Sequence, residues 1–213
     1  MTTIILICKE PLPGKAKTRL HPPLSLEHAA ELAAASIQDS LAVMMAIPAT
    51  RRVLAFDGNL LPLGSESCDV MMQTSGPLDE RLAAIFDASE GPTVLIGMDT
   101  PQVTAADLAP AFRSLGGEWP DDVDAWFGCA TDGGFWALGM KEPRGDLIRG
   151  VPMSQDDTGS IQFQRLRDAG LTVGLLPRLT DVDTFDTATE VAALAPHTHF
   201  ARTFRRVTER QFA

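Results

Sequence analysis

Cationic side chains gather in one short segment near the N-terminus. Lys9, Lys15, Lys17 and Arg19 fall within eleven residues, and Gly14 gives the segment backbone freedom. Arginine offers a planar fork for two phosphate oxygens and lysine a mobile point charge, a mixture suited to a diphosphate or a phosphorylated substrate. The segment matches neither the GxxxxGK[ST] phosphate loop nor the GxGxxG dinucleotide fingerprint. From the residues alone, phosphate binding and a solvated basic loop are equally supported.

Two later segments supply carboxylates that could hold a divalent cation. Asp99 directly follows an apolar run, and Asp181 and Asp183 are separated by one residue, so their side chains point the same way if the chain is extended. Taken alone, Asp99 is most simply a turn former or helix cap. Magnesium in proteins is held by one or two carboxylates together with substrate phosphates and water. Two such aspartates facing the basic segment would complete a metal–diphosphate site.

The turn Asp132-Gly133-Gly134 has two interpretations. Its glycines are typical of a strand connection that needs unusual backbone angles, whereas its carboxylate could accept a proton from an acceptor hydroxyl. We favour the structural role. Four histidines have no partner at triad or metal-ligand spacing, the three cysteines include no CxxC pair, and GxSxG is absent. Nothing therefore indicates a covalent mechanism or a zinc site.

Alternating strands and helices must position these residues. The run 3–8 is apolar and β-branched throughout, which predicts a strand buried on both faces, and Ser25 is expected to cap a helix over 26–44 that Pro48 ends. We expect further strands at 53–56, 70–72, 93–97, 125–129, 135–140 and 171–176, with helices at 78–86, 104–115, 161–169 and up to 195. This order predicts a single α/β domain with a mostly parallel central sheet, helices on both faces, and ligands at the carboxyl edge of the strands.

Composition narrows the class of protein. A chain of 213 residues is one large domain or at most two small ones, and 45% apolar with 22% charged residues is ordinary for a packed fold. The formal net charge of −10 disfavours nucleic acid and anionic membranes as partners. No run approaches the ~18 apolar residues of a membrane span, and no basic signal region precedes the first strand. We therefore expect a cytoplasmic protein.

The last residues, 196–213, have a pattern of their own. Phe200, Phe204 and Val207 share one face at helical spacing, and four arginines occupy the other faces. The pattern predicts an Arg-rich C-terminal helix or tail beyond a domain of residues 1–195. Its apolar stripe would dock on the body of the chain or on a second subunit, so a homodimer stays open.

Several short motifs, in this order and spacing, resemble the DUF2064 proteins, also called selenodomain-associated transferase 1. The resemblance spans roughly residues 1–195. It implies the GT-A fold of the nucleotide-diphospho-sugar transferase superfamily, and the chain is similar also to 2-phospho-L-lactate guanylyltransferase and molybdenum cofactor guanylyltransferase. The motifs are Lys9-x-Pro-x-Pro-Gly-x-Ala-Lys-Thr-Arg-Leu, Leu24-Ser25, Asp79-Glu80-Arg81-Leu82, Ile96-Gly97-Met98-Asp99-Thr100-Pro101, Asp132-Gly133-Gly134-Phe135-Trp136 and Asp181-Val182-Asp183-Thr184.

The resemblance also implies site residues. It places nucleotide binding in the N-terminal half, a metal ligand at Asp99 and a second acidic ligand near Asp183. Asp79-Glu80-Arg81 would contact the nucleotide, although an ion-pair cluster on a helix surface explains these three residues equally well. Phe135 replaces a common tyrosine, and Met153-Ser154 replaces Trp-Ser/Thr, departures that bear on the acceptor pocket rather than on the nucleotide half.

These expectations combine into a transferase dependent on Mg²⁺ or Mn²⁺, acting on a nucleotide or nucleotide-sugar donor and a small-molecule acceptor. Catalysis would rest on positioning and on stabilising a diphosphate leaving group. By family label, glycosyl transfer ranks first; nucleotidyl transfer that releases pyrophosphate, and a non-catalytic nucleotide sensor, are the alternatives. The expected metal ligands are Asp99 and Asp183, the expected nucleotide-binding residues are Lys9, Gly14, Lys15, Lys17, Arg19 and Arg81, and the expected catalytic residues are Asp99, Lys17 and Arg19.

Overall fold

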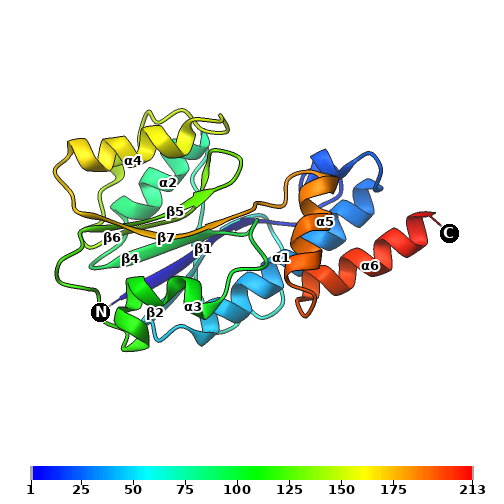
Figure 1. The fold of residues 1–213 in the computed structure, drawn as a ribbon, viewed down its shortest axis with the longest axis horizontal. Coiled ribbons are helices and arrows are strands. Elements are labelled where there is room, and N and C mark those ends of the chain that lie inside the picture. Colours follow the sequence, from blue (N-terminus) through cyan, green and yellow to red (C-terminus); the bar gives the residue numbers. More distant parts are fainter. Residues whose placement is uncertain (1, 213) are drawn as a thin grey trace.

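A seven-stranded sheet in the order β3-β2-β1-β4-β6-β5-β7 runs through the middle of the computed structural model, which describes residues 2–212 (Figure 1). Strand β6 is antiparallel to both its neighbours, and every other pairing is parallel. The predicted mostly parallel sheet is therefore confirmed. The strands are β1 (Thr3–Lys9), β2 (Arg51–Asp57), β3 (Asp69–Met72), β4 (Thr93–Gly97), β5 (Ala125–Ala130), β6 (Phe135–Met140) and β7 (Val173–Leu179).

Helices cover both faces of this sheet. Figure 1 shows α2 and α4 on one side of the strands and α1 and α3 on the other. The α-helices are α1 (Leu26–Ala46), α2 (Leu78–Asp87), α3 (Ala105–Leu108), α4 (Thr158–Asp168), α5 (Phe185–Leu194) and α6 (His199–Phe212), and the 3-10 helices are η1 (Thr18–Leu20), η2 (Ala109–Leu115) and η3 (Gly145–Leu147).

The central strand β1 explains why its sequence is apolar throughout. It pairs with β2 on one side and β4 on the other, so its side chains face helices on both faces. Ile4 and Leu6 pack in the cluster that contains α1, whereas Ile5 packs in the cluster that contains α2. Burial of apolar surface contributes about 25 cal/mol per Å² to stability, so residues buried on both faces hold β1 firmly in place. The loop after β1 therefore starts from a rigid base.

The Arg-rich C-terminal segment forms helix α6, which packs against α1 and α5. Phe200, Phe204 and Val207 are buried in this cluster, so the apolar stripe docks on the body of the same chain. Asp39, in the middle of α1, accepts hydrogen bonds at 2.8 Å from the backbone N–H groups of His199 and Phe200 and thereby caps α6. No helix within residues 2–212 combines the length and apolarity that crossing a bilayer requires.

Among the predicted elements, those at 104–115 and 171–176 differ most from expectation. The capping box of Thr104 and Asp107 is present, but the α-helix it opens ends at Leu108 and continues as a 3-10 helix, so the predicted helix to residue 115 is wrong in type. Pro110 has no amide hydrogen to donate to the carbonyl of Ala106, which ends the α-helical pattern. Strand β7 is displaced from the predicted 171–176 and includes Pro177, which an edge strand tolerates.

Candidate functional site

A pocket of about 590 Å³ opens at the carboxyl ends of β1 and β4. The chain adds β2 and β3 on one side of β1 and then crosses to add β4 on the other. Such a reversal leaves a crevice between neighbouring strands, because their connections lead away to opposite faces, and ligands of open α/β sheets bind there. Lys9, Gly97 and Asp99 line the pocket at this point.

Five carboxylates line the same pocket, and apart from Asp156, which precedes α4, they come from three connections. Asp99 follows β4, Asp132 lies in the turn between β5 and β6, and Asp181 and Asp183 follow β7. The backbone N–H of Val182 donates to the carbonyl oxygen of Asp99 at 2.8 Å, which ties two of these connections together. The structure therefore brings Asp99 and Asp183 to one place, although 84 residues separate them in the sequence.

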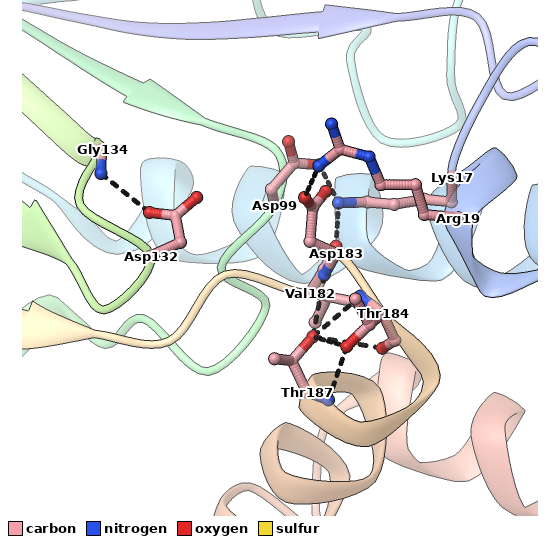
Figure 2. A network of polar contacts seen from close by, with 9 residues as sticks. All are labelled: Lys17, Arg19, Asp99, Asp132, Gly134, Val182, Asp183, Thr184 and Thr187. Atoms are coloured by element: carbon pink, nitrogen blue, oxygen red, sulfur yellow. Dashed lines mark hydrogen bonds and ion pairs between the residues drawn. The ribbon is translucent and has the colours of Figure 1, made fainter. Parts of the chain in front are cut away.

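A capping box fixes the position of Asp183 at the start of α5. The Thr187 hydroxyl accepts hydrogen bonds from the backbone N–H groups of Asp183 at 2.9 Å and of Thr184 at 3.0 Å, and the Thr184 hydroxyl accepts from the N–H of Thr187 at 3.3 Å. These bonds satisfy amide groups that the first turn of a helix leaves free. The carboxylate of Asp183 is thus held at a helix N-terminus, facing the pocket (Figure 2).

Two cations of the N-terminal segment meet these carboxylates. The ammonium nitrogen of Lys17 lies 2.6 Å from Asp99 Oδ1 and also donates to the carbonyl of Val182, and Arg19 pairs with Asp183 (Figure 2). The side chain of Lys17 is only 6% exposed, whereas that of Arg19 is 69% exposed. Lys17 therefore enters the site, and Arg19 closes it from the solvent side.

The other predicted phosphate-binding residues are divided. Lys9 and Arg81 line the pocket, but Gly14 and Lys15 do not, and the side chain of Lys15 is exposed to solvent. Arg81 is held in place, because its Nη1 donates to Gln73 Oε1 at 3.0 Å. The amide of Gln73 in turn donates to backbone carbonyls of β1 and β2 at 2.8 and 2.9 Å.

Asp79 and Glu80 face away from the pocket. Asp79 accepts a hydrogen bond from the backbone N–H of Gly150 at 2.8 Å, and Glu80 pairs with Arg149 at 3.0 Å. Neither residue lines the pocket. In the Asp79-Glu80-Arg81 motif, an ion pair therefore describes Glu80 only, Asp79 binds a backbone amide, and Arg81 alone lines the pocket.

Asp181 stands out although nothing in the sequence distinguishes it from Asp183. Its Oδ1 is buried and has no hydrogen-bond partner among the described residues. Burial raises the pKa of Asp181 to about 7, and the neighbouring carboxylates of Asp99 and Asp132 add to the increase, while Lys17 opposes it. A buried carboxylate oxygen without a partner is costly. Burial and the pairing of Asp183 with Arg19 separate the two aspartates, and neither residue type nor spacing reports either feature.

The turn between β5 and β6 is built by its own residues. Asp132 Oδ1 accepts the N–H of Gly134 at 2.8 Å, and the N–H of Gly159 donates to the carbonyl of Gly133 at 2.8 Å. Gly133 has a φ of +91°, and an added Cβ would lie 1.8 Å from the carbonyl oxygen of Asp156. The structural role favoured for this turn is thus visible, and Figure 2 shows Asp132 apart from the Lys17 and Asp99 pair.

The acidic residues of this site do not form a ready-made metal cage. Among residues 2–212, no three His, Cys, Asp or Glu side chains stand together in an arrangement that would hold a metal ion. The ion pairs explain why, since Asp99 and Asp183 are each turned toward a cation of the N-terminal segment.

Comparison with known proteins places this geometry in context. A likeness to solved structures extends over nearly the whole chain: a candidate nucleotide-diphospho-sugar transferase from Desulfovibrio desulfuricans G20 has a TM-score of 0.81 and 25% identity, with 98% of this chain and 94% of that chain covered. The 2-C-methyl-D-erythritol 4-phosphate cytidylyltransferase of Thermus thermophilus has a TM-score of 0.54 and 15% identity, with 92% of this chain and 100% of that chain covered. Rv0371c of Mycobacterium tuberculosis H37Rv, solved in complex with manganese, has a TM-score of 0.52 and 18% identity, with 92% of this chain and 98% of that chain covered.

At these identities the last two structures show the fold alone, and together with the first they confirm the fold that the motifs implied. A search of curated proteins gave no match. The model of the family described as "Uncharacterized protein conserved in bacteria (DUF2064)" matches residues 31–155, more than half of the sequence. The chain therefore belongs to the DUF2064 family.

Proposed function

We propose that this chain is a metal-dependent transferase that uses a nucleotide-activated donor, with glycosyl transfer from a nucleoside diphosphate sugar as its reaction. The supporting observation is one pocket, at the reversal of strand order, in which Lys17 and Arg19 face Asp99 and Asp183. Cations suit the phosphates of a donor, and carboxylates suit the divalent cation that accompanies them. The likeness to the D. desulfuricans protein, described as a candidate nucleotide-diphospho-sugar transferase, supports the same class.

The residues present fit a hard divalent cation. The side-chain donors are carboxylate oxygens, which Mg²⁺ and Mn²⁺ prefer, and the buried Oδ1 of Asp181 has no hydrogen-bond partner within residues 2–212. Asp99, Asp181 and Asp183 would hold the cation once Asp99 and Asp183 are released from their pairs with Lys17 and Arg19. When bound, it would supply positive charge that polarises the donor's phosphates.

The remaining work falls to the cations of the pocket. Lys17 and Arg19, which pair with Asp99 and Asp183, would bind the diphosphate and stabilise the charge that develops as it leaves. Arg81, fixed by Gln73, stands among apolar side chains of α2 and would orient the nucleoside end of the donor. Holding both ends of the donor positions its reacting carbon for an acceptor hydroxyl, and no enzyme nucleophile is required.

Calorimetry of nucleotide binding tests the donor site. Nucleoside diphosphates titrated in the presence of Mg²⁺ should bind the wild-type protein, and Asp99→Asn should weaken that binding at least tenfold, which is about 1.4 kcal/mol. The matched control is Asp122→Asn, which removes the same charge from an exposed position outside the pocket. Equal affinities of the wild-type protein and Asp99→Asn would refute the metal-dependent donor site.

Product analysis then tests the reaction. Release of a nucleoside diphosphate from a nucleotide sugar supports glycosyl transfer. Release of pyrophosphate from a nucleoside triphosphate would replace it with nucleotidyl transfer. Metal-dependent binding without turnover of either donor class, across a panel of hydroxyl acceptors, would instead identify a nucleotide sensor.

A further inference from the structure

The two aspartates that the sequence predicts as metal ligands are both neutralised from within the chain. We propose that Lys17 is a resident cation that takes the place of the divalent ion at Asp99, so that the metal enters only as Lys17 moves to the donor's phosphates. This inference rests on the proposed function, since it concerns the order in which metal and donor fill that site. It predicts that metal and polyphosphate each raise the affinity of the other.

Geometry sets the conflict between Lys17 and a metal. Its ammonium lies 2.6 Å from Asp99 Oδ1, and a magnesium ion binds a carboxylate oxygen at about 2.0–2.1 Å, so the two cations would compete for the same carboxylate at close range. They also repel each other, and burial of the Lys17 side chain reduces the screening by water. Asp99 itself is 45% exposed, so a metal can approach it once the ammonium has left.

The backbone on either side of Lys17 is anchored, so the side chain can move without the loop. Ala16 and Leu20 are fully buried, and the N–H of Ala16 donates to the carbonyl of Leu12 at 3.1 Å. Lys17 has a φ of +51°, a left-handed conformation that is uncommon for a residue with a side chain. The anchored turn aims the lysine into the site, and its flexible four-carbon stem allows the ammonium to swing from Asp99 to a phosphate.

Arg19 is a weaker candidate for this role. Its pair with Asp183 is on the surface, with 69% and 39% of the two side chains exposed, so water and salt screen it. With Lys17 at Asp99, the buried Oδ1 of Asp181 finds no hydrogen-bond partner in the described part of the chain. Removal of Lys17 therefore leaves neighbouring carboxylates with excess negative charge, which a divalent ion can neutralise. This is why coupling between metal and phosphate binding is expected to be positive.

Binding of Mn²⁺ alone to the full chain, measured by electron paramagnetic resonance, tests the proposal without an activity assay. Lys17→Gln removes the charge but keeps a donor for the Val182 carbonyl, and it should bind Mn²⁺ about tenfold more tightly than the wild-type protein. The control is Lys141→Gln, which removes the same charge at the opposite edge of the sheet, beyond the end of β6, and should leave the affinity unchanged. Equal or weaker Mn²⁺ binding by Lys17→Gln would overturn the proposal.

A second measurement needs no variant and keeps the proposal testable if Lys17→Gln fails to fold. In the wild-type protein, a nucleoside diphosphate should raise the affinity for Mn²⁺ at least about fivefold beyond the affinity of the nucleotide itself for the ion. Tight Mn²⁺ binding that nucleotide does not change would refute the resident cation. Tighter binding by Lys17→Gln with no nucleotide binding at all would instead refute the transferase and leave the role of Lys17 supported.

Discussion

Replacing Asp181 by asparagine should stabilise the metal-free protein at neutral and alkaline pH. The folded chain raises the pKa of this carboxyl from 3.8 to about 7, chiefly because burial penalises its charge and secondly because Asp99 is nearby. The folded state therefore holds the Asp181 proton more tightly than the unfolded state. Stability from this group is present at low pH and is lost as the pH rises from about 4 to about 7. Asparagine has nearly the same shape and never carries the charge.

The size of the effect follows from the two pKa values. One pH unit corresponds to about 1.4 kcal/mol, so the interval between 3.8 and about 7 corresponds to about 4 kcal/mol as an upper bound. At pH 5 well under half of this penalty applies, because the folded group is still protonated. The stabilisation by Asp181→Asn should thus be about 2–3 kcal/mol larger at pH 8 than at pH 5.

Urea unfolding with EDTA present, at pH 5 and pH 8, measures this difference directly. Asp122→Asn serves as the control, since its carboxyl is exposed and its replacement should change stability by less than about 0.5 kcal/mol at either pH. If Asp181→Asn changes the free energy of unfolding equally at both pH values, or destabilises the protein at pH 8, the burial argument is wrong. The same variant should lose affinity for Mn²⁺, because a ligand charge is gone.

Three further predictions concern the scaffold. Asp39→Ala removes the cap of α6 and should cost about 2–3 kcal/mol, lowering the melting temperature in calorimetry by about 5–10 °C; an unchanged melting temperature would contradict the cap. Gly133→Ala, which would collide with the Asp156 carbonyl, should lower the free energy of unfolding in urea by at least about 2 kcal/mol more than Gly150→Ala, since Gly150 has a similar φ but open space around it. Equal decreases for the two variants would mean that the backbone of the turn shifts to accommodate the added methyl group. Burial raises the pKa of the Cys8 thiol to about 12, so mass spectrometry should find Cys8 unlabelled by iodoacetamide at pH 8 until the chain is denatured; rapid labelling of the native protein would contradict this.

Periodicity was sufficient to predict most of the fold. Ser25 caps α1 as expected, because a side-chain oxygen before an apolar helical pattern satisfies a free N–H group, here that of His28 at 3.1 Å. The pattern failed where local chemistry or exposure decided the outcome. Pro110 converts the end of the predicted helix into a 3-10 helix, and β7 continues through Pro177 to Leu179, because an edge strand tolerates the missing amide hydrogen of proline. Of the two edge strands, only β7 was misplaced, since β3 was predicted to within one residue.

The site was harder to predict from the sequence than the fold. The meeting of Asp99 with Asp183 follows from a general rule, because parallel strands deliver the residues after them to one edge. The choice of Lys17 over Lys15 does not follow, since it depends on a left-handed turn beside the buried Ala16. Likewise, Asp181 and Asp183 are identical in type and differ only in what the fold places around them. Sequence can identify the charges of a site more readily than their pairing.

The departures from local preference gather at this pocket. Among residues 2–212, three residues other than glycine have a positive φ, and two of them, Lys17 and Ser154, line it. The unpartnered oxygen of Asp181 lies there as well. Such features are destabilising in the free protein and persist where the surrounding structure enforces them. A ligand that draws Lys17 away from Asp99 and neutralises Asp181 would remove part of this destabilisation. The arrangement that lowers the stability of the free protein would therefore favour binding of metal and phosphate together.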